Sequence, residues 1–191
     1  MKRLFIAAAV TVLLSGCSAV DNSRVYTLNS LSFRTELEVT ENVDSIHVKD
    51  EAYDGVFSIF CERSSENIPS FEEYYQGLID QYMSMDKLAD GWTADYCMDE
   101  KTVTINGTPT QAKSLEISLY RPEVGCSRYY VEEVRLELGE ELYGIRYVYD
   151  TMLDDVEYNY DPEHDNDDIQ EVKDRAALMY ENIQINSGAA A

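Results

Sequence analysis

Basic residues are scarce in this chain of 191 residues, where 15 lysines and arginines stand against 37 aspartates and glutamates. The formal net charge is −22, and this deficit of lysine and arginine argues against nucleic-acid binding, which depends on those side chains. Histidine is scarcer still, with two residues, and the cysteines are widely spaced, so a zinc site is not expected. Because 45% of the residues are hydrophobic and 15 are tyrosines, the acidic composition does not indicate disorder.

The sequence also lacks the common catalytic motifs. Its nine glycines are scattered, so no phosphate-binding loop is present, and no serine lies in a Gly-x-Ser-x-Gly sequence. His47 and His164 lie in segments expected to be exposed, whereas nucleophilic catalysis needs a base beside the nucleophile. Paired carboxylates arise by chance in so acidic a chain, so they carry little signal. We therefore expect a non-enzymatic protein, with a hydrolase that uses carboxylates as the alternative.

No apolar run reaches the roughly 20 residues that a permanent transmembrane helix needs. The longest, Leu4–Leu14, follows two basic residues and has the length of the central region of a secretory signal. The small residues Ser15 and Gly16 then indicate a peptidase site directly before Cys17. The sequence thus predicts a signal peptide over residues 1–16.

Leu14-Ser15-Gly16-Cys17 resembles the lipobox of bacterial lipoproteins. The resemblance implies cleavage between Gly16 and Cys17, a diacylglyceryl group on the Cys17 thiol, and acylation, for example with palmitate, of the new N-terminus. It also implies an extracytoplasmic protein anchored to the cell membrane through lipid. Ser18 replaces the aspartate that retains lipoproteins at the inner membrane, which favours the outer membrane if the host is Gram-negative. An ordinary secretory signal with an incidental cysteine is the alternative.

The remaining chain is expected to form one domain. Residues 17–24 form the lipidated N-terminus and a short polar tether, 25–186 a single domain, and 187–191 a flexible tail. No stretch rich in glycine, proline or serine divides 25–186, and its length suffices for one sizeable core.

Three cysteines remain for this domain, and export permits a disulfide between two of them. If a helical crossover joins the strand ending at Cys61 to the strand after Trp92, the two strands run parallel. Cys61 then lies at one end of the sheet, while Cys97 and Cys126 lie at the other. This makes Cys97–Cys126 the preferred of three pairings, although each cysteine could also be a small buried apolar residue.

Hydrophobic periodicity predicts strands first and then a helix. Alternation at Leu31/Phe33 and at Leu37/Val39, and the apolar run 56–61, are typical of strands. Ser70 followed by Glu73 forms a capping box, which starts a helix with the apolar stripe Phe71, Tyr74, Tyr75, Leu78 and Tyr82.

After Gly91 the period changes to that of an antiparallel meander. Val103 and Ile105 lead into Asn106-Gly107, a strong two-residue hairpin signal, and residues 111–120 form the return strand. A second hairpin joins 129–138 to 142–149 around Gly139. Asp167 or Asp168 then caps a helix whose apolar face comprises Ile169, Val172, Ala176, Met179 and Ile183. The predicted fold class is therefore α+β: a central antiparallel sheet of about 5–7 strands covered by two amphipathic helices in an α/β/α sandwich.

The segments "TVTINGTPTQAKSLEI" and "ELYGIRYVYD", within 92–149, are similar to the sheet of PsbP-like domains. That resemblance implies an α/β/α sandwich with a binding or assembly role, and it carries over no catalytic residue.

One acidic segment, "DTMLDDVEYNYDPEHDNDDIQE" from Asp150 to Glu171, offers oxygen ligands for a hard cation. It lacks the spacing of an EF-hand, so it predicts at most weak Ca²⁺ binding, and no cofactor is expected beyond the covalent lipid. The candidate ligands are Asp161, Asp165, Asp167 and Asp168. The alternative is a solvated linker whose last aspartates favour the helix N-terminus.

Tyrosines on the meander form the candidate partner-binding surface: Tyr129, Tyr143, Tyr147 and Tyr149. Exposed aromatic rings beside acidic groups would suit a basic or polyhydroxy partner, whereas the alternative is that they pack under the helices. The sequence favours a non-enzymatic binding or assembly module of the cell envelope. Its partners would be the membrane, through the lipid anchor, and an envelope protein or glycan.

Overall fold

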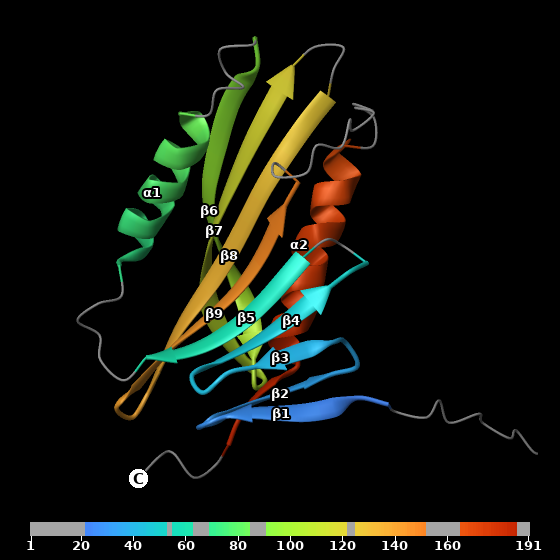
Figure 1. Cartoon of the computed structure of the whole chain (residues 1–191). Coiled ribbons are helices and arrows are strands. Elements are labelled where there is room, and N and C mark those ends of the chain that lie inside the picture. The colour runs from blue at the N-terminus through green and yellow to red at the C-terminus, as the bar shows by residue number, and fades with distance from the viewer. Residues whose placement is uncertain are drawn as a thin grey trace, which may run out of the picture.

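The structure is a computed structural model that describes residues 22–52, 55–62, 69–84, 91–121, 125–151 and 165–186. Over these residues the chain is mostly β, with 61% strand, two helices and two antiparallel sheets. Figure 1 shows the larger sheet as a tall twisted layer, with the smaller sheet below it.

The smaller sheet joins the two ends of the described chain. β1 (Arg24–Leu28) and β2 (Leu31–Thr35) form a hairpin through Asn29, which has a φ of 49°. β10 (Ile183–Ile185) pairs antiparallel with β2, with Ile183 opposite Phe33.

The larger sheet has the strand order β3-β4-β5-β9-β8-β7-β6, and all neighbouring strands are antiparallel. Its long meander confirms the two predicted hairpins, and Asn106 and Gly107 adopt the positive φ values of 51° and 73° that a two-residue turn requires. The strand bounds are β3 Val39–Glu41, β4 Ser45–Asp50, β5 Gly55–Glu62, β6 Thr93–Ile105, β7 Thr108–Arg121, β8 Gly125–Leu138 and β9 Glu141–Asp150.

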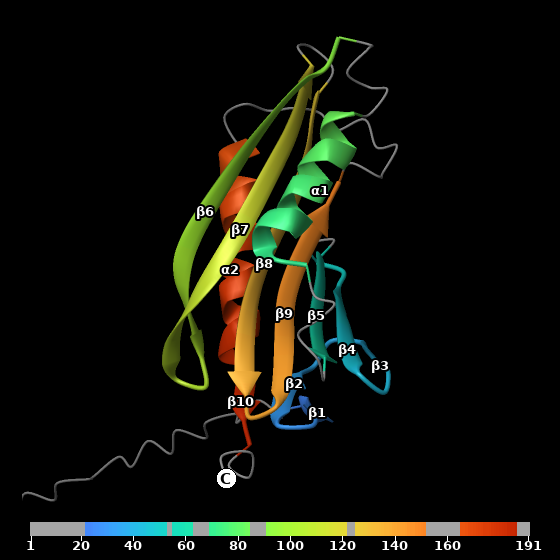
Figure 2. The ribbon, with the colours of Figure 1, turned by 90° about the vertical axis from the view of Figure 1, so that its left-hand side faces the viewer.

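The two helices lie on opposite faces of the larger sheet (Figure 2). α1 (Phe71–Met83) begins with the predicted capping box: Ser70 accepts a hydrogen bond from the Glu73 amide, and the Glu73 carboxylate accepts one from the Ser70 amide. α2 (Asp165–Glu181) packs against β6 and β5. Its predicted apolar face is buried, but Ile183 belongs to β10 rather than to the helix.

The predicted fold class, a single central sheet covered by two helices in an α/β/α sandwich, is wrong. Strands dominate, and the first hairpin forms a separate sheet with the last strand instead of extending the central sheet. The helices contact only part of the larger sheet, because α1 lies mainly on β7 and α2 mainly on β6 and β5. The small sheet and β3 lie below α1 (Figure 1), and β4 contacts α2 at its end, where Asp50 pairs with Arg175.

The core has two parts, one on each face of the larger sheet. Leu115, Ile117 and Leu119 of β7 are buried under α1 with Tyr75 and its neighbours, which confirms their predicted alternation. On the other face, apolar side chains of α2, β5 and β9 form a cluster that extends into the small sheet through Phe33 and Ile183. The small sheet therefore shares the core of the larger one.

Described strands and helices run from Arg24 to Ile185. The predicted signal peptide, Cys17 and the tail 187–191 lie outside the described residues. Neither of the described helices is long and apolar enough to cross a membrane.

Candidate binding site

Tyrosine hydroxyl groups hold α1 on the sheet. Buried Tyr75 donates a hydrogen bond to the carbonyl oxygen of Lys113, at 2.7 Å, and buried Tyr82 donates one to the Asp150 carboxylate, at 2.8 Å. Burial is the main cause that raises the pKa of both phenols well above the ordinary value. They therefore remain neutral donors, and the position of the helix is fixed by polar as well as apolar contacts.

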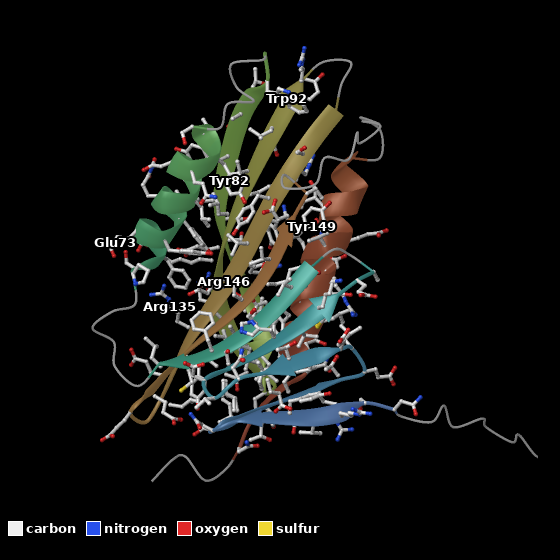
Figure 3. The ribbon with its side chains drawn as sticks, in the orientation of Figure 1. Glu73, Tyr82, Trp92, Arg135, Arg146 and Tyr149 are labelled. Carbon is white, nitrogen blue, oxygen red and sulfur yellow. The ribbon has the colours of Figure 1, made fainter. Side chains whose placement is uncertain are left out.

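Beneath the N-terminal half of α1 lies a fully buried glutamate, Glu133 of β8. One carboxylate oxygen lies 2.9 Å from Arg135 Nε and the other 2.7 Å from Arg146 Nε. The Arg146 guanidinium stacks on Tyr74, 4.2 Å from its ring centre, and that of Arg135 lies 4.3 Å from the ring centre of Phe71. Figure 3 labels both arginines beside the end of α1 that carries Glu73. We call these three charged residues the Glu133 cluster; it connects the sheet to the aromatic side chains of the helix.

A pocket of about 390 Å³ opens next to this cluster, between the N-terminal half of α1 and the middle of β6. Its apolar lining comes from Phe71, Tyr75 and Met98, and its polar lining from Glu72, Asp99, Glu100, Lys113 and Ser114. We call it the α1 pocket.

The α1 pocket carries more negative than positive charge. Lys113 Nζ lies 2.7 Å from the Glu72 carboxylate, 3.6 Å from that of Glu100, and 5.3 Å from the ring centre of Phe71. The hydrogen bond from Lys113 lowers the pKa of Glu72, and the same bond raises the pKa of Lys113. Two carboxylates, those of Glu72 and Glu100, therefore surround one ammonium group, and the aromatic lining suits a ligand that combines positive charge with an apolar stem.

The opposite face of the sheet buries its own carboxylate. Glu132, also fully buried, lies 2.7 Å from Lys101 Nζ and accepts a hydrogen bond from the Tyr130 hydroxyl. Tyr180 of α2 donates to the Glu132 carbonyl oxygen at 3.0 Å. The second carboxylate oxygen, Oε1, has no hydrogen-bond partner among the described residues.

The predicted tyrosine surface does not exist as an exposed platform. Tyr129, Tyr143 and Tyr147 are buried, and Tyr149 is half-buried against the core. Tyr129 lies on the α1 side of the sheet, whereas Tyr143 and Tyr147 lie on the other side. Burial, followed by its hydrogen bond to Glu141, raises the pKa of Tyr143 to about 12. The three buried tyrosines are therefore core residues: Tyr129 packs under α1 beside Tyr82, whereas the Tyr143 hydroxyl accepts a hydrogen bond from the Ser30 amide of the small sheet.

The structure does not bring the predicted disulfide pair together. Cys97 lies on β6 and Cys126 on β8, with β7 between them; Cys97 is level with Tyr130, four residues beyond Cys126. Two strand spacings, about 10 Å, and four residues, about 13 Å, separate the cysteines, whereas a disulfide needs Cα atoms within about 7 Å. No disulfide joins the cysteines that the structure describes. The prediction placed both at the same end of the sheet but neglected the strand between them.

The candidate Ca²⁺ ligands remain a prediction. Asp161 lies outside the described residues, and Asp165, Asp167 and Asp168 begin α2, where only the backbone is described. Among the described residues no group of three or more potential metal ligands was found.

The Glu133 cluster and the α1 pocket were not predicted from the sequence. The sequence signal that could have found the cluster is the run Glu132-Glu133-Val134-Arg135 within an otherwise apolar strand, with Arg146 on the next strand. A strand buried on both faces must pair each of its charges, so opposite charges on neighbouring strands were a detectable sign.

No known protein family matches the sequence, and no curated protein matches it. The structure is similar to cyanobacterial PsbP (CyanoP) from Synechocystis sp. PCC 6803, with 10% identity and a TM-score of 0.42 over 89% of this chain and 96% of that one. A Pseudomonas aeruginosa protein of unknown function gives 12% identity and a TM-score of 0.28 over 79% of this chain and 94% of that one.

Proposed function

We propose that this chain is a lipid-anchored extracytoplasmic protein whose domain acts as a binding or assembly module of the cell envelope. The observation that carries the proposal is the lipobox-like Leu14-Ser15-Gly16-Cys17, in register after a charged and then apolar N-terminus. A diacylglyceryl group together with a third acyl chain gives firm membrane attachment, because each buried methylene contributes about 0.8 kcal/mol.

The short spacing from the anchor bears on what such a module could reach. β1 begins at Arg24, seven residues after Cys17, and seven extended residues span about 25 Å. The domain would therefore stay close to the membrane surface, while its net negative charge disfavours contact with anionic lipid. Partners anchored in or near the same membrane are the ones within reach.

A binding role is further supported by the α1 pocket, because its lining offers carboxylates and aromatic rings but no described nucleophile beside a base. The partner class that this lining fits is cationic. An envelope protein with exposed lysine or arginine meets that description better than an uncharged glycan does.

Metabolic labelling with radioactive palmitate tests the anchor. We expect label on the wild-type chain and none on Cys17→Ser, with Cys97→Ser as the matched control that keeps its label. Label that persists on Cys17→Ser would contradict the proposal. In a Gram-negative host, we expect the protein in the outer-membrane fraction, and Ser18→Asp should shift it to the inner-membrane fraction.

A further inference from the structure

β6 forms a long outer edge of the larger sheet. It has 13 residues and ends the strand order, so among the described strands it pairs with β7 alone. Figure 2 shows the upper part of β6 rising above the upper end of α2. Here the side chains from Asp95 to Glu100 are all exposed, including Tyr96 at 46% and Met98 at 57%. Such an edge is a template for an additional strand.

Two amides on this edge are already bonded to carboxylates of the same strand. The Tyr96 amide donates to Asp95 Oδ1 and the Glu100 amide to Asp99 Oδ1, each at 2.8 Å. Ile105 and Thr108 close the two-residue turn, so the Ile105 amide points towards β7. Amide direction alternates along a strand, and the amides of even-numbered β6 residues therefore point away from β7. Asp95 and Asp99 therefore occupy donors that an added strand would need.

The same segment forms one wall of the α1 pocket. Met98, Asp99 and Glu100 line it from β6, opposite Phe71 and Tyr75 of α1. A strand added beside β6 would therefore place every second side chain next to Met98 and the mouth of this pocket.

The charge of the edge restricts which strands fit. Thr93–Glu100 contains three carboxylates and no basic residue. Antiparallel pairing of two copies would oppose like charges and leave the two amides occupied, which disfavours self-association. A lysine or arginine of an incoming strand can instead attract the carboxylate, and the amide is then released to a carbonyl oxygen of that strand.

We infer that Thr93–Glu100 is a strand-addition site for an extended, lysine- or arginine-rich segment of another protein. Asp95 and Asp99 close the edge to neutral and acidic strands and to a second copy of the chain, and a cationic strand displaces them. One cationic side chain of the partner lies beside Met98 at the mouth of the α1 pocket, where it can reach the Glu100 carboxylate. The inference rests on the proposed binding function and names its partner class.

Fluorescence anisotropy with the full chain in nonionic detergent tests this site. The probe is a blocked peptide of alternating lysine and threonine, and its counterpart has glutamate in place of lysine. We expect the lysine peptide to bind at least 100-fold more tightly. Tyr96→Pro, which removes an outward amide but leaves the β7 ladder intact, should weaken that binding at least tenfold, whereas Tyr96→Ala should change it less than threefold.

A charge-matched pair of variants separates the site from general attraction to an acidic protein. The double variant Asp95→Asn/Asp99→Asn should weaken binding of the lysine peptide at least tenfold. The control is the double variant Glu137→Gln/Glu140→Gln, whose residues are exposed at the β8–β9 turn, and it should weaken binding less than threefold. Hydrogen exchange should slow at β6 amides when the peptide binds. Asp95→Ala with Asp99→Ala should promote self-association in sedimentation experiments.

The inference is overturned if the lysine peptide does not bind at millimolar concentration. It is also overturned if the two double variants lose equal peptide affinity, or if Tyr96→Pro binds the peptide as tightly as the wild-type chain does. Circular dichroism on each variant shows whether it is folded. If Tyr96→Pro is unfolded, hydrogen exchange on the wild-type chain with bound peptide replaces it as the test. The inference is then overturned if the peptide leaves the β6 amides unprotected. Palmitate labelling of Cys17 is independent of all these results. A labelled protein that fails to bind the peptide therefore contradicts the inference and not the anchor.

Discussion

Glu132 and Glu133 are neighbours on β8, and both are fully buried, but they point to opposite faces of the sheet and are paired differently. Glu133, on the α1 side, engages Arg135 and Arg146 with its two carboxylate oxygens, and both guanidinium groups stack on aromatic rings. Glu132, on the α2 side, contacts Lys101 and the Tyr130 hydroxyl through the same oxygen, Oε2. Its other oxygen, Oε1, has no hydrogen-bond partner among the described residues.

The difference shows how geometry decides what a buried carboxylate contributes. The two arginines are 19% and 24% exposed and fixed by stacking, so they cannot easily regain water if the carboxylate is lost. Lys101 is 32% exposed and has a flexible stem, so its ammonium group can turn to solvent. Loss of the buried glutamate on the α1 face should therefore lower the free energy of unfolding more than loss of the one on the α2 face.

The largest expected effect comes from Glu133→Gln. Removing this charge leaves two partly buried guanidinium groups without their counterion, and we expect a loss of about 3 kcal/mol in the free energy of unfolding. Urea denaturation measures it. Glu137→Gln on the same strand is exposed and should stay within about 0.5 kcal/mol of wild type. An effect of Glu133→Gln as small as this control would refute the role of the cluster.

Glu132→Gln should cost less, about 1–2 kcal/mol, because Lys101 can rehydrate and the glutamine oxygen can still accept from Tyr130. The same urea titration gives the comparison directly. Equal losses for Glu132→Gln and Glu133→Gln would show that the two faces do not differ in the way that the pairing indicates.

Ser70→Ala tests how firmly α1 is placed over the Glu133 cluster. It removes the side-chain acceptor of the capping box next to Pro69, whose carbonyl oxygen accepts from Arg135 at 2.7 Å. We expect a loss of about 1 kcal/mol, and Ser70→Asp, which retains a capping oxygen, should restore most of it. Unchanged stability in Ser70→Ala would mean that the cap does not hold the helix end.

The smallest effect concerns the exposed pair at the rim of the α1 pocket. The hydrogen bond from Lys113 lowers the pKa of Glu72, so Lys113→Met should return it towards the ordinary value of 4.5. The stabilisation from this pair is fully present above that value and is lost as the pH falls through the lower pKa of the folded protein. An NMR titration of the Glu72 carboxyl carbon measures the shift, and an unchanged pKa would contradict the pairing.

Local signals predicted the meander and the start of α1, because each depends on a few adjacent residues. Asn106-Gly107 supplies the positive φ values of its turn, and Ser70 with Glu73 supplies the cap. The second sheet was not predictable in this way, since the three residues of β10 form a strand only by pairing with β2. The fold class was therefore missed although the hairpins of the meander were found.

The candidate site was hidden for a related reason. Alternation along a strand predicts one buried and one exposed residue for Glu132-Glu133, but helices cover both faces of β8, so both are buried. The predicted tyrosine surface became core because α1 covers Tyr129 and the small sheet covers Tyr143. The α1 pocket depends on how α1 meets β6, which periodicity within either element does not specify.

β10 also has a consequence for the order in which the fold can be completed. Asn186, next to this strand, accepts a hydrogen bond from Ser32, 154 residues earlier in the sequence. A chain secreted from its N-terminus delivers the β1–β2 hairpin first and its covering strand last. In the exported protein that we propose, the first hairpin would remain without this neighbour until β10 had also crossed the membrane, which delays closure of the small sheet.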